Sequence, residues 1–130
     1  MAIKYELVKE GRVLWQTYTD PVDMAEIATH IEKLHRQFYD KATRPIHAIS
    51  DFSAVTKLPK NIISGSLNIM RHSHPMNGEL VLITTNRFVT TMARIFRQSA
   101  SRQKITLCQT LDEAWELIDR ILEKEAAKVS

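Results

Sequence analysis

Four consecutive apolar residues constrain the fold of this chain more than any other feature. Residues 80–83 read Leu-Val-Leu-Ile and follow Asn77-Gly78, a pair typical of a tight turn, so Glu79–Thr85 is predicted to be a strand. A strand that is apolar at successive positions is covered on both faces, as in parallel sheets. The chain is therefore expected to contain a buried, mainly parallel sheet.

Strand-like and helix-like segments alternate along the rest of the sequence. Two β-rich segments, Tyr5–Val8 and Arg12–Tyr18, flank Glu10-Gly11 and predict a hairpin. Later strands are expected at Ile46–Phe52, Glu79–Thr85 and Lys104–Cys108, and helices are expected to begin at Asp20-Pro21, Pro59, Asn86 and Thr110. Strands separated by helices imply right-handed crossovers. The predicted fold class is α/β, with an N-terminal β-hairpin and a mixed, mainly parallel sheet of about five strands with four helices.

Length and composition fit one domain. The 130 residues are 44% hydrophobic and 25% charged, which is typical of a folded chain. We expect a single domain over residues 1–130, with its core at about 3–122 and a charged tail at 123–130 that frays. No apolar run approaches the roughly 20 residues of a membrane span. The first residues are too polar for a secretory signal, so a cytoplasmic protein is expected.

Positive charge is concentrated in the middle of the sequence. Residues 57–104 carry eight Lys and Arg against one Glu, a formal charge of +7, whereas the whole chain carries +3. Such a segment is typical either of a surface that binds phosphates or an acidic protein, or of a solvated face balanced by acidic neighbours elsewhere. The aromatic residues of the expected helix there lie at core spacing and form no stacking platform, so nucleic-acid binding is not expected.

The sequence contains no convincing catalytic or cofactor motif. None of its three glycines has a partner at the spacing of a phosphate-binding loop. We therefore expect no cofactor and no enzymatic activity. His72 and His74 could present two imidazoles on one side of a loop, but the neighbouring sequence offers only weak third ligands. They are weak metal candidates, and no metal site is predicted. Cys108, the single cysteine, is expected to be a buried structural thiol.

The segment Ile49–Thr56, which reads Ile-Ser-Asp-Phe-Ser-Ala-Val-Thr, resembles the STAS family. This family is typified by the anti-sigma-factor antagonists of the stage-II sporulation type. A closing strand followed by Thr-Leu-Asp-Glu-Ala at 110–114 is similar to the family's last strand and helix. The resemblance covers about residues 3–122. The long first helix after a hairpin looks more like the divergent STAS-like proteins that occur as stand-alone bacterial open reading frames.

The resemblance implies a non-catalytic regulatory module that binds a protein partner, such as a regulatory kinase or another component of a sigma-factor pathway. In phosphorylated members a serine at a helix start is the switch residue. Lys60 stands at that place here, so the phosphorylation site is not carried over. The expected partner surface is the loop and helix at 56–70, extended by the basic helix. Its candidate residues are Ser53, Thr56, Lys57, Lys60, Ser64, Arg87, Arg94 and Arg97.

The related lipid-binding Sec14-type domains imply an alternative function, a carrier of a small apolar ligand or lipid in an apolar groove. The candidate lining residues are Trp15, Met70, Met76, Phe88 and Met92. Methionine suits adaptable pockets, although a plain hydrophobic core explains the same residues. The first hairpin also leaves an edge strand, so we hypothesise that the chain forms a homodimer.

Overall fold

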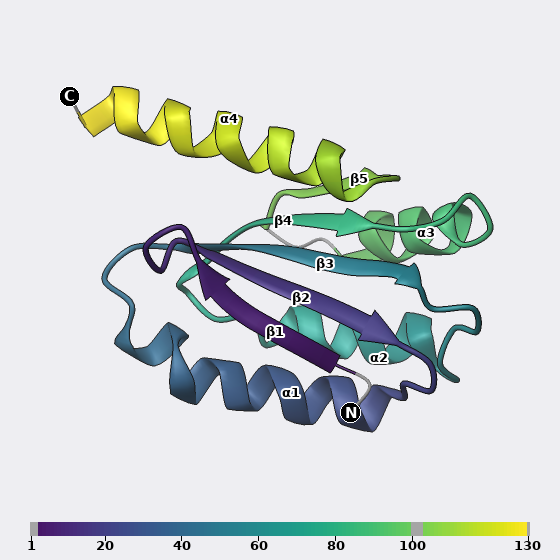
Figure 1. Ribbon diagram of the computed structural model, residues 1–130. Coiled ribbons are helices and arrows are strands. Elements are labelled where there is room, and N and C mark those ends of the chain that lie inside the picture. The colour runs from purple at the N-terminus through teal and green to yellow at the C-terminus, as the bar shows by residue number, and fades with distance from the viewer. Residues whose placement is uncertain (1–2, 100–102, 130) are drawn as a thin grey trace.

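The computed structural model of the protein describes residues 3–99 and 103–129 (Figure 1). Arg102, which belongs to the basic segment of the sequence, lies outside these residues. The strands are β1 (Ile3–Val8), β2 (Val13–Thr19), β3 (Ile46–Ala54), β4 (Asn77–Ile83) and β5 (Ile105–Cys108). The α-helices are α1 (Met24–Gln37), α2 (Ile62–Arg71), α3 (Val89–Ser99) and α4 (Leu111–Val129), and a short 3-10 helix occupies Tyr39–Lys41.

The five strands form one sheet in the order β1-β2-β3-β4-β5. The hairpin strands β1 and β2 are antiparallel, whereas β2, β3, β4 and β5 run parallel to one another. In the register of the central strands, Ile49 lies opposite Trp15 on one side and Val81 on the other. The predicted fold class is confirmed: an N-terminal hairpin is followed by alternating helices and strands in a mixed, mainly parallel sheet.

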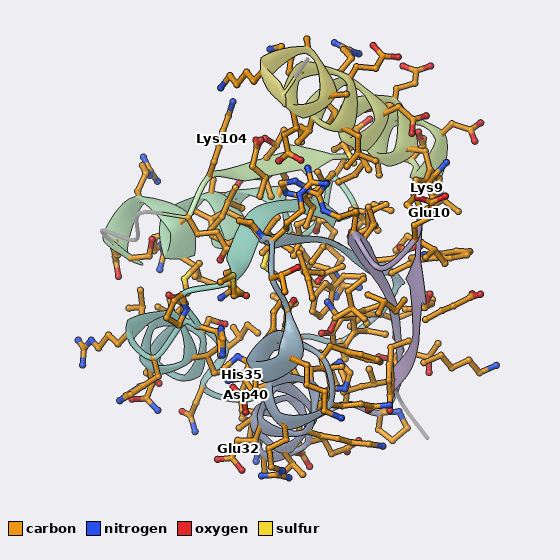
Figure 2. All side chains as sticks on the ribbon, turned by 90° about the vertical axis from the view of Figure 1, so that its left-hand side faces the viewer. Lys9, Glu10, Glu32, His35, Asp40 and Lys104 are labelled. Carbon is orange, nitrogen blue, oxygen red and sulfur yellow. The ribbon has the colours of Figure 1, made fainter. Side chains whose placement is uncertain are left out.

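Helices cover both faces of the sheet. In Figures 1 and 2, α4 lies on one side, and α1 and α2 lie on the other. Successive residues of a strand point to opposite faces, so Ile49 and Val81 pack with Ile118 of α4. Phe52 and Leu82 point the other way and pack with α1 and α3. Val81, Leu82 and Ile83 of the apolar run are buried and Leu80 is half-buried, so the run is covered on both faces, as its sequence indicates.

The first helix begins later than the sequence predicts. The sequence predicts a helix that begins at Asp20-Pro21, but α1 starts at Met24. The carboxylate of Asp23 accepts the capping hydrogen bond from the backbone N–H of Glu26 at 2.7 Å. The carboxylate of Asp20 is engaged elsewhere, because it accepts hydrogen bonds from the backbone and hydroxyl of Thr56. The two aspartates thus have different roles: one begins the helix, and the other holds the loop after β3.

Asn77-Gly78 is not a turn but the start of β4. Gly78 is required there by close packing rather than by turn geometry. A Cβ atom at this position would lie 2.4 Å from Nδ1 of His47 and 3.1 Å from the carbonyl oxygen of Ile46. The glycine therefore lets β4 lie tightly against β3.

The C-terminal segment from residue 123, which the sequence predicts to fray, is helical. Helix α4 begins at Leu111, where the hydroxyl of Thr110 accepts a hydrogen bond from the backbone N–H of Glu113, as the capping-box pattern predicts. The helix then continues to Val129 instead of ending near residue 123. Glu125 in its last turns forms hydrogen bonds with Arg12 and His47, which explains why a charged segment remains helical and docked.

Candidate functional site

The loops that follow β2, β3 and β4 meet at the carboxyl edge of the sheet. Thr56 joins them: its backbone and hydroxyl donate to Asp20, and its carbonyl oxygen accepts a hydrogen bond from Nη1 of Arg87 at 3.4 Å. The bonds from Thr56 lower the pKa of the exposed Asp20 carboxyl. The carboxyl edge of parallel strands is where open α/β sheets bind ligands. Two of the predicted surface residues, Thr56 and Arg87, are therefore in direct contact at this edge.

The other predicted residues of the β3–α2 region are exposed around this contact. Lys57 and Lys60 lie in the loop with their side chains in solvent. Ser53 donates its hydroxyl proton to Oδ1 of Asp51 at 2.6 Å, at the end of β3. Ser64 lies in the first turn of α2, where its hydroxyl donates to the carbonyl oxygen of Asn61. The region thus presents lysines together with hydroxyls that are already hydrogen-bonded locally.

Helix α3 extends the cationic surface. It buries Met92 and Ile95 against the sheet, and this leaves Arg94 and Arg97 exposed to solvent. Arg87 precedes the helix, and its guanidinium lies 5.4 Å from the centre of the Phe88 ring. All the cations predicted for the partner surface are exposed. Lys57, Lys60 and Arg87 come from adjoining loops of the carboxyl edge, and Arg94 and Arg97 come from the neighbouring helix.

A second feature lies between α2 and the sheet. None of the residues of α2, all of which the structure describes, is fully buried. Beneath the helix are two adjoining cavities of about 130 and about 120 Å³. Both are lined by residues from α1, β3, α2 and β4, namely Ile31, Ser50, Ile69, Met70 and Leu80. The space under α2 is therefore mainly apolar, with the Ser50 hydroxyl on the sheet.

A buried chain of hydrogen bonds borders this space. Nε2 of Gln16 donates to Oγ of Ser50 at 3.1 Å, and Oε1 of Gln16 accepts from the hydroxyl of Tyr18 at 3.2 Å. The same Oε1 lies 2.6 Å from Nε2 of His30, which must carry the ring proton because a carbonyl oxygen only accepts. Burial, and to a smaller extent the charge of Lys33, lowers the pKa of His30 to about 4. Burial also raises the pKa of Tyr18.

The structure separates the five residues predicted to line an apolar groove. Met70 lines both cavities, and Met92 lines the smaller one. Met76 packs in the cluster around Leu34 and Tyr39, and Phe88 is buried at the start of α3. Trp15 lies on the opposite face of the sheet, where its ring meets Trp115 of α4 edge-on at 5.8 Å. Two of the five candidates thus lie at a common cavity.

The two weak metal candidates are engaged in other contacts. Nδ1 of His74 accepts a hydrogen bond from the backbone N–H of Met76, and its Nε2 donates to Asp40 at 2.8 Å. The ring of His74 also lies 5.1 Å from the ring of His35, tilted by 58°. Figure 2 shows His35, in the last turn of α1, close to Asp40 in the 3-10 helix that follows. His72 contacts the carbonyl oxygen of Asn68 instead. Within residues 3–99 and 103–129, no group of three or more His, Cys, Asp or Glu side chains could hold a metal ion.

Cys108 is buried at the end of β5. Burial, the nearby charge of Glu113 and that of Asp51 raise the pKa of its thiol, which favours the protonated form. A protonated, buried thiol is a poor nucleophile. The residue therefore behaves as a structural side chain.

Sequence reasoning missed the polar chain of Gln16, Tyr18, Ser50 and His30. The sequence contains the signal for this network in the two-residue period of the strands and in the helical period of α1. Gln16 falls between Leu14 and Tyr18 on the same face of β2, and Ser50 falls between two apolar neighbours on the matching face of β3. His30 lies three residues after Ile27, on the apolar stripe of α1. Polar residues at inward positions indicate a buried network, because such groups require hydrogen-bond partners.

Comparison of the chain with models of protein families, with curated proteins and with solved structures found no match. Among the described residues, no helix is both long enough and apolar enough to cross a membrane.

Proposed function

We propose that this chain is a non-catalytic interaction module that binds a protein partner at the carboxyl edge of its sheet. The observation that carries the proposal is the contact of Thr56 with Asp20 and Arg87, which ties three loops into one surface. Lys57 and Lys60 are exposed beside it. The partner is an acidic surface of a regulatory protein, of the kind that the STAS resemblance implies.

The charge distribution supports an acidic partner. The cations of this region are exposed, whereas Glu79, the one acidic residue of the segment 57–104, lies in β4 and its carboxylate faces Lys104 at 3.7 Å. The exposed carboxylate of Asp20 also lies in this surface, but the five exposed lysines and arginines outnumber it. A surface with an excess of one sign of charge speeds association with a partner of opposite sign and selects against partners of like sign. Membership of the STAS family remains part of this proposal, and the confirmed fold class is in keeping with it.

Charge reversal tests the proposed surface. The variant K57E/K60E/R97E should lose a protein that the wild-type chain captures from a lysate of its own cells, measured by quantitative mass spectrometry. A control variant, R36E/K41E/R44E, makes the same change of charge at exposed residues of α1 and the segment that follows it. The control should keep the captured protein. Equal recovery with both variants, or capture of nothing by the wild type, would contradict the proposal.

The cavities under α2 favour a second candidate function, the binding of a small apolar ligand. Their lining includes Met70, whose flexible side chain adapts to different shapes. Their volumes are below the roughly 300 Å³ at which ligand pockets begin. A larger ligand would therefore have to displace α2, whose residues are only partly buried. This candidate is the carrier function that Sec14-type domains suggest.

Native mass spectrometry of the chain purified without detergent tests the carrier function, because a retained ligand adds a defined mass. Binding of the dye anilinonaphthalene sulfonate gives a second measurement. Ile69→Phe should fill the space under α2 and reduce dye binding, whereas Leu122→Phe on α4 makes the same change of size on the other face of the sheet. Equal dye binding by the two variants, with no retained mass, would exclude the candidate.

A further inference from the structure

Strand β1 is an open edge of the sheet. It is first in the strand order, pairs with β2 on one side, and no described strand pairs with its other side (Figure 1). Its odd-numbered residues pack toward α1, whereas Lys4 and Glu6 point to the opposite face and are exposed. An edge of this kind presents unpaired backbone N–H and C=O groups that can accept a further strand.

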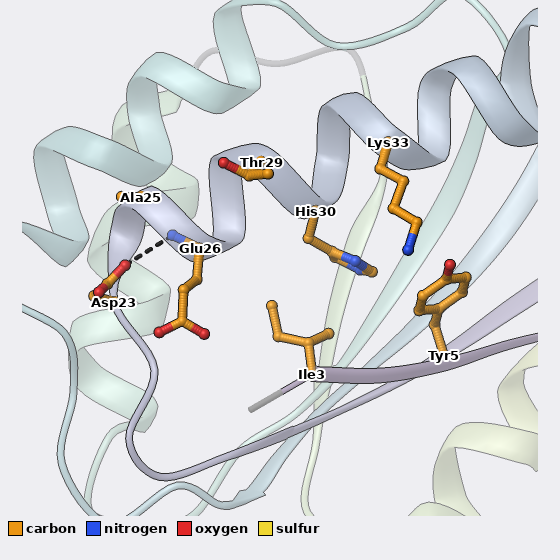
Figure 3. A pocket seen from close by; sticks show the side chains of 8 residues that line it. All are labelled: Ile3, Tyr5, Asp23, Ala25, Glu26, Thr29, His30 and Lys33. Carbon is orange, nitrogen blue, oxygen red and sulfur yellow. Dashed lines mark hydrogen bonds between the residues drawn. The ribbon is translucent and has the colours of Figure 1, made fainter. Parts of the chain in front are cut away.

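A groove lies along this edge, between β1 and α1. It encloses about 440 Å³ and is lined by Ile3, Tyr5, Asp23, Ala25, Glu26, Thr29, His30 and Lys33. Figure 3 shows Asp23 and Glu26 at one end of the groove, near Ile3, and Lys33 at the other end beside Tyr5. The Lys33 ammonium lies 5.2 Å from the centre of the Tyr5 ring. The groove is therefore acidic at one end and basic at the other.

We propose that two copies of this chain pair through antiparallel addition of their β1 strands, with Tyr5 on the two-fold axis. The two sheets then become one continuous sheet. In this register Lys4 of one copy lies opposite Glu6 of the second copy, and Glu6 lies opposite Lys4. Opposite charges and aromatic pairs that face each other directly across strands are stabilising. Both copies use the same surface, as a two-fold dimer requires.

The sequence of β1 selects this register over its neighbours. If the two-fold axis moves from Tyr5 to Lys4, Lys4 of one copy faces Lys4 of the second copy. If the axis moves to Glu6, Glu6 of one copy faces Glu6 of the second copy. Each shift creates a like-charge pair, which is unfavourable. Registers that move the strand by an odd number of residues would mix the two faces of the sheet. Charged side chains on an edge strand can also serve to prevent pairing with another strand. That role does not require charges that complement each other across a two-fold axis, as Lys4 and Glu6 do.

The groove is self-complementary in the same sense. Ile3 lies near the start of α1 and Tyr5 lies further along it, so β1 and α1 run in the same direction. A two-fold axis through Tyr5 therefore makes the two α1 helices antiparallel. The Lys33 end of one groove then lies toward the Glu26 end of the other. The charges of β1 and those of the groove beside α1 thus both favour the same partner, a second copy of this chain.

Charge swaps test the dimer without disturbing the fold, because both side chains are exposed. In Lys4→Glu every cross-strand charge pair joins two glutamates, and in Glu6→Lys every pair joins two lysines. Sedimentation velocity should show the wild type with the mass of two 15.0 kDa chains. Each single variant should dimerise about 10- to 30-fold more weakly than the wild type. The double variant K4E/E6K restores opposite charges and should restore the dimer.

A mixture of the two single variants gives the sharpest result. Their strands carry opposite charges at both positions, so the mixture should form a heterodimer although neither variant dimerises well alone. The control Lys41→Glu changes an exposed lysine outside the interface and should leave the dimer unchanged. A monomeric wild type would overturn the proposal. A dimer insensitive to the single swaps, or one that neither the double variant nor the mixture restores, would overturn it equally.

Discussion

Nε2 of His47, on the α4 face of β3, lies 2.7 Å from Oε1 of Glu125 in the last turns of α4. The other ring nitrogen of His47 accepts a hydrogen bond from the backbone N–H of Glu79 at 2.9 Å, so Nε2 carries the proton and donates to the carboxylate. The second carboxylate oxygen of Glu125 accepts a hydrogen bond from Arg12. One side chain thus fastens the end of a long helix to both the hairpin and the central strand.

We expect Glu125→Ala to lower the free energy of unfolding by about 2–3 kcal/mol. The substitution removes hydrogen bonds to a charged group and leaves the buried His47 without its acceptor. Glu123→Ala is the matched control, because Glu123 is an exposed residue of the same helix and the gain in helix propensity is the same. Urea unfolding of both variants measures the difference. Equal stability of the two would show that the contact contributes nothing.

His30 should make the stability of the fold depend on pH. Its pKa is lowered to about 4 in the folded state, against about 6.5 in an unfolded chain, so only the unfolded chain binds a proton between these values. The contribution of His30 to the free energy of unfolding is therefore complete above pH 6.5 and is lost as the pH falls toward 4. The expected loss is about 3 kcal/mol.

Urea unfolding across this pH range tests the role of His30. His30→Gln keeps a donor toward Gln16 but cannot titrate, so its stability should change less between pH 7 and 4 than that of the wild type. His72→Gln replaces an exposed histidine and should keep the wild-type slope. A wild-type slope in His30→Gln would disprove the assignment.

Local patterns in the sequence predicted the elements, and long-range contacts account for what they missed. The apolar run in β4 and the capping pattern at Thr110 report on their own surroundings, so both were predicted correctly. The role of Asp20 depends on Thr56, 36 residues away, and that of Glu125 depends on His47, 78 residues away. Patterns within a few residues of sequence carry no information about partners this far away along the chain. The exposed cations of the proposed surface were predictable as charges, but their grouping required the topology.

Two glycines should respond in opposite ways to the same substitution. Gly78→Ala places a methyl group against the His47 ring and the β3 backbone, which cannot move freely, so we expect a loss of roughly 2–3 kcal/mol from overpacking. Gly65→Ala in α2 meets Cε and Cγ of the Met24 side chain at 2.7 and 3.0 Å, and this side chain is half-buried and can change its rotamer. Alanine is also favoured over glycine in a helix by up to about 1 kcal/mol. Thermal unfolding of both variants measures the contrast. A stable Gly78→Ala variant would contradict the packing argument.

Gln16 should be the member of the buried polar chain that tolerates substitution least. Gln16→Met leaves the Tyr18 hydroxyl, the His30 ring and the Ser50 hydroxyl without their common partner, at an expected cost of about 2–4 kcal/mol. Tyr18→Phe removes one donor, and Oε1 of Gln16 keeps His30, so a cost near 1 kcal/mol is expected. Urea unfolding ranks the two variants. A larger loss of stability in Tyr18→Phe than in Gln16→Met would show that Gln16 is not the central member of the hydrogen-bond network.

Helix α2 should be the least protected helix in amide hydrogen exchange. Local opening is easiest where few side chains are buried, and none of the residues described in α2 is fully buried, whereas α1 buries Ile27, His30 and Leu34. Exchange followed by mass spectrometry should therefore label 62–71 before 24–37. Ile69→Phe, which fills the space beneath α2, should slow exchange in α2 and leave α1 unchanged. Equal protection of the two helices in the wild type would mean that α2 is fixed to the sheet and that the space below it opens to no ligand.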